Sequence, residues 1–307
     1  MKKTLIALTV LLSSAMIATA QQKSPEALRS AVEKAEAAAE NPKKAGKPDT
    51  WMKIGKAYVD AYNGPAGQLW TGASQAEIQL VTGNAQPISV ETVELGGSPC
   101  QKQVFADKEL YFNQQGQLVL IKVTKPVYED ALAKAVEAYA KAGELDPAGK
   151  KSKAITEALN DISGKYLTEG MNEYTLGNLK TSSLDFENAA NAAMTPPSNR
   201  LDTTAVYNAG FTAWAYANAL AQTDSLAAVA EYRRAKGFFE TCLANGYYYE
   251  GGEVFAKLHD INNKLGDKEA ARQVLETGFQ KYPDSQSILI SLINFYIENN
   301  EDPDKLF

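Results

Sequence analysis

The chain has 307 residues, of which 45% are hydrophobic, and its 31 Lys and Arg against 37 Asp and Glu give a net charge of −6. An acidic chain without a block of basic residues repels phosphate backbones and anionic lipids, which argues against nucleic acid and anionic membranes as partners. The single histidine, His259, excludes zinc sites built on several histidines, and we expect no metal and no cofactor.

Residues 1–20 have the features of a secretory signal: two lysines near the start, an apolar run over 5–12 and an Ala-x-Ala end. The apolar run is too short to cross about 30 Å of hydrocarbon, so a membrane anchor is the weaker alternative. Gln21 stands where a bacterial lipoprotein would need cysteine. The pattern predicts cleavage after Ala20 and a mature protein of net charge −8, without a transmembrane segment, exported to the bacterial periplasm or the medium.

A helix is predicted within 24–47. Ser24 is a suitable N-cap, Pro25 fits the first helical position, and Asn41-Pro42 interrupts the alanine-rich sequence that follows. We expect this segment to pack as a cap on the next helix.

The most informative pattern begins at Trp51. Two groups of residues make it up: Trp51, Ile54, Gly55 and Tyr58, and, much later, Ala135, Tyr139, Ala142 and Pro147. The pattern resembles the tetratricopeptide repeat, a 34-residue pair of antiparallel helices with large and small residues at fixed positions. The resemblance implies a helical-repeat scaffold that binds other molecules, and no enzymatic activity.

An insertion separates the two halves of this first repeat. Tyr58 and Ala135 are 77 residues apart, where the repeat has nine, so about 68 extra residues lie roughly within 63–127. Five short segments there are rich in Val, Ile, Tyr and Phe: 76–81, 88–95, 101–105, 109–113 and 117–123. They predict a small antiparallel sheet of four or five strands, with a hairpin loop over 113–116. A helix is expected to begin near Tyr128.

The rest of the chain, 128–307, is expected to continue as similar repeats. The residues that match are Gly170, Gly177, Phe186 and Ala189 in the second, Gly210, Ala235, Phe239 and Cys242 in the third, and Leu258, Gly266, Ala271, Leu275, Gly278 and Pro283 in the fourth. In the third repeat, Gly210 and Ala235 are 13 residues further apart than in the consensus, so its helices or the loop between them must be longer. Leu289, Leu292 and Tyr296 begin a fifth, which is incomplete at Phe307, so we expect more repeats in a longer protein.

These patterns predict a mainly α fold, a solenoid of antiparallel helix pairs with a small antiparallel β-sheet inserted. The expected parts are the signal 1–20, a capping helix and the first repeat helix in 21–62, the insertion 63–127 and the repeats 128–307.

Residues with catalytic potential are few. His259 occupies the position of the repeat's glycine, which favours a structural role over catalysis. Carboxylates lie mainly at helix starts, where they favour the helix dipole, and a carboxylate-only hydrolase is the least favoured alternative. Cys100 and Cys242 fall in different predicted units, so we expect buried free thiols and no disulfide.

The resemblance implies that the first helix of each repeat lines a groove that holds the ligand. It assigns to this groove Met171, Tyr174, Tyr207, Phe211, Trp214, Asp260, Asn263 and Lys264. The spacing of Tyr207, Phe211 and Trp214 also fits an ordinary buried helix face, and core packing is the favoured interpretation of these three. Tyr247 to Tyr249 form a further aromatic run, which is expected to pack between repeats unless its rings are exposed.

The functional prediction is a non-catalytic protein–protein interaction scaffold of the bacterial cell envelope. Its unidentified protein or peptide partner would bind in the groove or on the β insertion. The alternative is a glycan-binding protein that uses the aromatic residues of the groove. Met52 and Lys56 do not match the pattern of repeats that clamp a C-terminal carboxylate, which argues against acidic tails as ligands.

Overall fold

A computed structural model describes residues 23–83 and 85–298 of the protein. The predicted signal and the end of the fifth predicted repeat lie outside these residues. The helices are α1 (Pro25–Glu40), α2 (Pro42–Ala45), α3 (Pro48–Asn63), α4 (Gln75–Val81), α5 (Ala131–Glu144), α6 (Ser152–Thr175), α7 (Leu179–Met194), α8 (Thr203–Leu220), α9 (Ser225–Ala244), the 3-10 turn η1 (Glu250–Gly252), α10 (Glu253–Lys264), α11 (Lys268–Lys281) and α12 (Gln286–Glu298). The strands are β1 (Ser89–Leu95), β2 (Ser98–Val104), β3 (Lys108–Phe112) and β4 (Leu118–Val123).

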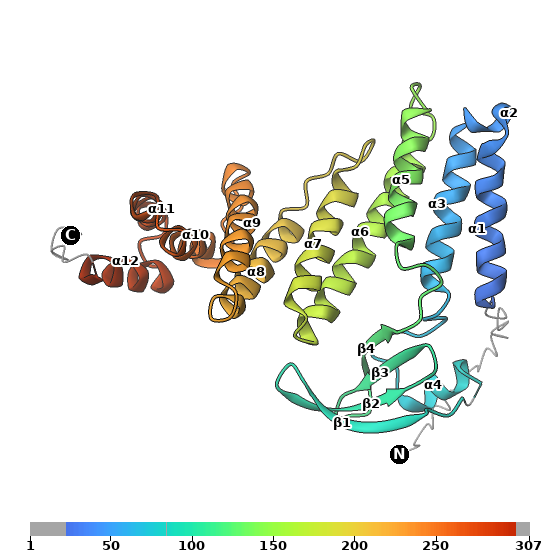
Figure 1. The fold of residues 1–307 in the computed structure, drawn as a ribbon, viewed down its shortest axis with the longest axis horizontal. Coiled ribbons are helices and arrows are strands. Elements are labelled where there is room, and N and C mark those ends of the chain that lie inside the picture. The colour runs from blue at the N-terminus through green and yellow to red at the C-terminus, as the bar shows by residue number, and fades with distance from the viewer. Residues whose placement is uncertain (1–22, 84, 299–307) are drawn as a thin grey trace, which may run out of the picture.

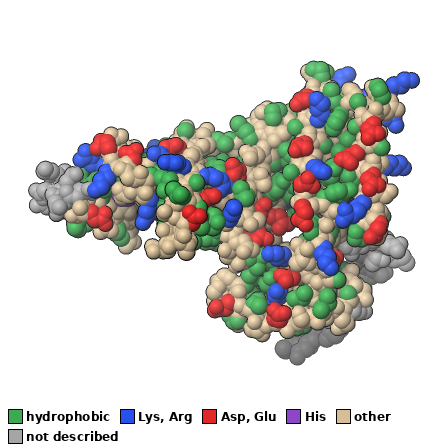
Figure 2. Space-filling model, viewed as in Figure 1, with side chains coloured by type: hydrophobic (Ala, Val, Ile, Leu, Met, Phe, Trp, Pro, Cys, Tyr) green, Lys and Arg blue, Asp and Glu red, His purple; other side chains and the backbone are tan. Residues whose placement is uncertain are grey.

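The described chain is mainly helical, and its long helices follow one another along the long axis of the molecule (Figure 1). Each packs on its neighbours in sequence from α5 to α12, while α3 packs on α1 and, across the strands, on α5. The predicted mainly α class with a small antiparallel sheet is confirmed. On the face seen in Figure 2, acidic and basic side chains are interspersed over the helices and the sheet.

A glycine allows close packing in several of these helix pairs. A methyl group at Gly55 of α3 would come within 2.6 Å of the Tyr139 ring of α5. The same holds for Gly170 of α6 against Phe186 of α7, at 2.9 Å, and Gly210 of α8 approaches the Phe239 ring of α9. Small residues opposite aromatic rings therefore recur at the helix contacts.

The N-terminal segment agrees with the prediction. The Ser24 hydroxyl accepts a hydrogen bond from the Ala27 amide, Pro25 occupies the first turn of α1, and the helix ends at Asn41. Leu28 and Val32 of α1 are buried in the cluster that includes Ile54 and Tyr58 of α3.

The segment between α3 and α5 folds as a four-stranded antiparallel meander in the order β1-β2-β3-β4. The predicted hairpin loop connects β3 to β4, with Gly116 at a φ of 73° and the Asn113 side chain accepting the amides of Gln115 and Gln117. This loop prediction is confirmed.

The first predicted strand, 76–81, is wrong, because these residues form α4. Ser74 caps this helix, and its hydroxyl and backbone amide exchange hydrogen bonds with the backbone and side chain of Glu77. This is the capping box that a Ser-x-x-Glu sequence forms. The cap fixes a helical turn, and Ile78 packs it against the sheet.

The sheet lies against the C-terminal end of α6. Lys122 of β4 pairs with Glu173 at 3.6 Å, and Leu176 packs on the cluster that contains Leu95 and Cys100. The helices α8 and α9, with 18 and 20 residues, are longer than α10 and α11, with 12 and 14. The extra length expected for the third repeat therefore lies in the helices themselves. At the other end of the row, Ile290, Ile293 and Ile297 form an exposed apolar stripe on α12.

Candidate functional site

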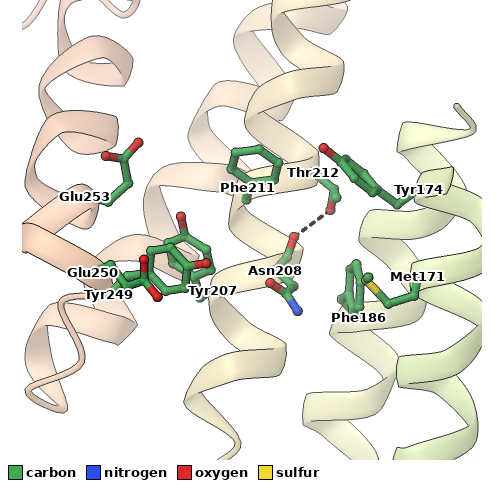
Figure 3. Close-up of a pocket in the computed structure, with 10 residues that line it drawn as sticks. All are labelled: Met171, Tyr174, Phe186, Tyr207, Asn208, Phe211, Thr212, Tyr249, Glu250 and Glu253. Carbon is green, nitrogen blue, oxygen red and sulfur yellow. Dashed lines mark hydrogen bonds between the residues drawn. The ribbon is translucent and has the colours of Figure 1, made fainter. Parts of the chain in front are cut away.

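The principal candidate site is a pocket of about 400 Å³ formed by α6, α8, the turn η1 and α10, with one residue from α7 (Figure 3). The residues that line it are Met171, Tyr174, Phe186, Tyr207, Asn208, Phe211, Thr212, Tyr249, Glu250 and Glu253. We call it the aromatic pocket. Its size and its mixture of rings with a few polar groups are typical of binding sites.

Four of the eight predicted binding residues line this pocket: Met171, Tyr174, Tyr207 and Phe211. Met171 and Tyr174 are about half exposed, at 54% and 42%, so their side chains can meet a ligand. Tyr207 is only 5% exposed and belongs to the hydrophobic core, which agrees with the favoured core interpretation.

The rings of the pocket pack in a row around Tyr207. Its ring stacks on Tyr249 with the centroids 4.1 Å apart and the planes 13° from parallel, and it lies 6.3 Å from Phe211. Phe211 in turn lies 6.1 Å from Tyr174 on the neighbouring helix. Burial, with a smaller contribution from Glu253, raises the pKa of Tyr207, so its hydroxyl stays neutral at physiological pH. The row is therefore a rigid, uncharged wall.

Tyr249 has an unusual backbone conformation, with φ at 56° and ψ at 178°. This region is essentially restricted to glycine, and a residue with a side chain there costs about 1–3 kcal/mol. The stack on Tyr207 and the two following glycines, Gly251 and Gly252, at φ 60° and 79°, hold the turn in place. Strain of this kind concentrates at functional sites, and here it places Tyr249 and Glu250 at the pocket.

One side of the aromatic row already holds a cation. The Lys257 ammonium lies 4.1 Å from the centroid of the Trp214 ring and 5.8 Å from that of Phe211. The same ammonium pairs with the Glu253 carboxylate at 2.8 Å. The Lys257 ammonium therefore contacts one carboxylate and two aromatic rings at the same time.

The other predicted residues lie around a second cavity of about 390 Å³, between α10 and α12. Asp260, Asn263 and Lys264 line it together with His259, Ser291, Asn294, Phe295 and Glu298. Trp214 lines neither cavity, and its indole N–H donates to the Asp260 carboxylate at 2.6 Å. Of the eight predicted residues, four therefore line the aromatic pocket and three line the second cavity. The eighth, Trp214, is bonded to Asp260.

His259 is buried and structural in its contacts. Nδ1 lies 3.1 Å from the Ala271 carbonyl and Nε2 lies 3.0 Å from the Asn263 amide nitrogen. These partners fit the neutral ring, with Nδ1–H donating to Ala271 and Nε2 accepting from Asn263. Burial lowers the pKa of His259, in accordance with this neutral form.

The aromatic run at 247–249 is mostly packed. Tyr248 stacks on Phe255 at 5.6 Å and lies under the Lys281 ammonium, and Tyr247 packs 6.1 Å from Tyr207. Only Tyr249 of the three is exposed, at 44%. Packing between helices is therefore confirmed for Tyr247 and Tyr248.

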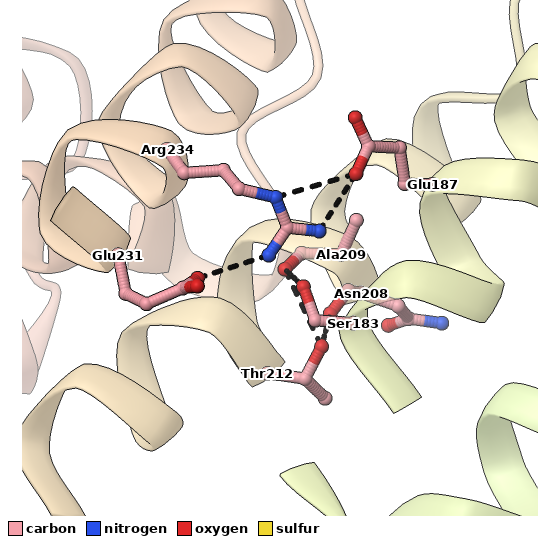
Figure 4. Close-up of polar contacts among 7 residues, drawn as sticks. All are labelled: Ser183, Glu187, Asn208, Ala209, Thr212, Glu231 and Arg234. Carbon is pink, nitrogen blue, oxygen red and sulfur yellow. Dashed lines mark hydrogen bonds and ion pairs between the residues drawn. The ribbon is translucent and has the colours of Figure 1, made fainter. Parts of the chain in front are cut away.

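Polar contacts join α8, which supplies four of the pocket residues, and its neighbours α7 and α9 (Figure 4). The Arg234 guanidinium of α9 binds Glu187 of α7 at 2.7 Å and Glu231 at 3.0 Å. Between α7 and α8, the buried Ser183 hydroxyl donates to the Ala209 carbonyl at 2.8 Å. These bonds connect α7, α8 and α9 and hold Tyr207 and Phe211 at fixed positions.

A group of carboxylates lies near the sheet, outside the set of residues that line the pocket. Burial, with Glu169 and Glu173 nearby, raises the pKa of Asp185 to about 7. Burial also raises the pKa of Glu169, which accepts a hydrogen bond from the Tyr62 hydroxyl. We interpret this group as part of the contact between α3, α6 and α7.

Both cysteines are buried and neither forms a disulfide, as expected. Burial raises the pKa of the Cys242 thiol to about 12, which makes it a poor nucleophile at neutral pH.

The sequence analysis missed the acidic side of the pocket. Glu250 follows the tyrosine run directly, Glu253 follows the glycine pair Gly251-Gly252, and Asn208 lies beside Tyr207 on α8. The pair Gly251-Gly252 next to Glu250 was the available signal, because a turn built on glycines brings neighbouring side chains toward the adjacent helix.

No protein-family model and no curated protein matches this sequence. The resemblance to tetratricopeptide repeats therefore remains a prediction from its motifs. Among the residues described, no helix has the length and apolar character needed to cross a membrane. In the same part of the chain, no three His, Cys, Asp or Glu side chains are grouped to hold a metal ion.

Proposed function

We propose that this protein is an exported, non-catalytic scaffold of tetratricopeptide-like helical repeats that binds a segment of a partner protein in the aromatic pocket. The observation that carries the proposal is the pocket itself, where exposed Met171 and Tyr174 meet Phe211 and the strained Tyr249. Aromatic anchors with polar groups at the rim are typical of protein recognition surfaces. The glycine–aromatic contacts at Gly55, Gly170 and Gly210 occur at the positions of the repeat motif and support the repeat assignment.

A peptide is favoured over a glycan because few rings are open. Stacking on a sugar needs an exposed ring face, but Trp214 is covered by Lys257, and Tyr247 and Tyr248 are packed. Tyr249 is exposed, yet one of its faces already stacks on Tyr207. Location in the bacterial cell envelope is part of the proposal and rests on the signal-like residues 1–20.

The proposal is tested by affinity capture of a partner from an envelope extract of the bacterium that encodes the protein. We expect a stoichiometric protein partner with the wild type and a loss of at least tenfold in its amount with the double variant Tyr174→Ala, Phe211→Ala. Leu226→Ala on α9 removes a more exposed apolar side chain outside the pocket and serves as the control.

A second pair of substitutions tests the sheet. Ile88→Glu, one residue before the edge strand β1, and Val90→Glu within β1 place charges at two exposed positions of this edge. Loss of the partner only in this variant would move the binding surface to the sheet and contradict the pocket assignment. Capture of no protein, together with binding to a glycan array, would favour the alternative function.

A further inference from the structure

The aromatic pocket combines ring faces with carboxylates on one side. Tyr207, Phe211 and Tyr174 provide the rings, and Glu250 and Glu253 lie at the end where η1 meets α10. None of the ten lining residues is a lysine or an arginine. A surface of this composition attracts a positive charge, because the ring faces and the carboxylates both present negative potential.

Next to the pocket, the ammonium group of Lys257 is already held by a carboxylate and by ring faces. Lys257 lies between the Glu253 carboxylate, at 2.8 Å, and the rings of Trp214 and Phe211. Phe211 belongs to both sets, since it also lines the pocket. The row of rings continues from Phe211 through Tyr207 to Tyr249, where the next carboxylate is Glu250.

Glu250 differs from Glu253 in its partners. In the described part of the chain, no lysine or arginine forms an ion pair with Glu250, which is exposed. A purely apolar anchor in the pocket would remove water from this carboxylate without replacing its interactions, and an acidic anchor would be repelled. A cationic side chain avoids both penalties.

We propose that the aromatic pocket takes the side chain of an arginine or lysine in the bound segment, with its charge against the exposed Tyr249 ring and beside Glu250. This inference rests on the proposed peptide-binding function and names the chemistry of its ligand. The strained Tyr249 then holds a ring and a neighbouring carboxylate in place for a cation before the ligand arrives.

The test begins with selection of binders from a phage-displayed library of random nonapeptides on the purified protein. We expect the selected sequences to share one Arg or Lys next to apolar residues. A synthetic peptide with the selected arginine is then compared with the same peptide carrying citrulline, which keeps the shape and removes the charge. The citrulline peptide should bind about tenfold more weakly in a fluorescence anisotropy titration.

The matching protein variant is Glu250→Gln, with Glu157→Gln, an exposed glutamate elsewhere on α6, as its control. Glu250→Gln should weaken the arginine peptide about three- to tenfold and leave the citrulline peptide unchanged, whereas Glu157→Gln should change neither. Selected peptides without a cation, or equal binding of the arginine and citrulline peptides, would overturn the inference and leave the proposed function standing. Selection of no peptide at all would contradict the proposed function itself.

Discussion

Trp214 donates its indole N–H to the carboxylate of Asp260 at 2.6 Å, which ties α8 to α10 between the two cavities. The resemblance assigned both residues to the ligand groove, with core packing the favoured interpretation of Trp214, and in the structure they bind each other. The bond keeps the face of Trp214 turned toward Lys257, and it thereby positions the aromatic row on which the proposed binding depends.

Removal of this acceptor should destabilise the fold. Asp260→Ala leaves a half-buried indole N–H without its partner, and we expect the free energy of unfolding in urea to fall by about 1–2 kcal/mol. Asp260→Asn keeps an acceptor oxygen and should lose less than half of that amount. Equal stability of Asp260→Ala and the wild type would show that water satisfies the indole.

Two glycines of α6 should respond to alanine in opposite directions. At Gly170 the new methyl group would lie 2.9 Å from the Phe186 ring, so Gly170→Ala should destabilise the protein by about 1–3 kcal/mol. At Gly164 no atom lies within 4 Å of the new methyl group, and Gly164→Ala should stabilise it by about 0.5–1 kcal/mol. Thermal unfolding of the two variants checks both signs, and a stable Gly170→Ala protein would contradict the close helix contact.

The only histidine of the chain gives a direct test of the packing between α10 and α11. Its pKa should lie below 6.5, because burial disfavours the imidazolium. A lowered pKa in the folded state means that the unfolded chain binds more protons below pH 6.5, so stability should fall as the pH drops from 6.5 through the folded pKa. The single imidazole resonance in a proton NMR titration reports this pKa. Asn263→Ala removes a hydrogen bond to the neutral ring and should raise the pKa toward 6.5.

Asp185 should have the opposite effect on stability. Its pKa is raised to about 7, mainly by burial, so the folded protein binds more protons than the unfolded chain between pH 4 and pH 7. Stability is therefore expected to decrease as the pH rises through this window. Asp185→Asn should remove this decrease and raise the free energy of unfolding at pH 8 on the order of 1 kcal/mol, after allowance for partial exposure to solvent. An unchanged pH profile of stability in the variant would show that Asp185 is ionised without cost.

Local features of the fold were predictable because they depend on residues close together in the sequence. Ser24 and Pro25 begin α1, and Asn113 and Gly116 form the hairpin loop, each through hydrogen bonds or φ values set within a few residues. The error at 76–81 has a local cause as well. The alternation of apolar residues favoured a strand, but the capping box between Ser74 and Glu77 sets the helix.

The sequence by itself determined the mainly helical class and the small antiparallel sheet, since hydrophobic periodicity and turn residues encode them directly. The four residues of the aromatic pocket came from the resemblance to the repeat family. Only the tertiary structure decided what these residues face. Tyr207 meets Tyr249 from a distant turn, and Trp214 meets Asp260 from another helix. Such pairings depend on how long helices pack against one another and on a strained turn, and no local pattern specifies which rings stay open or which carboxylate lies beside them.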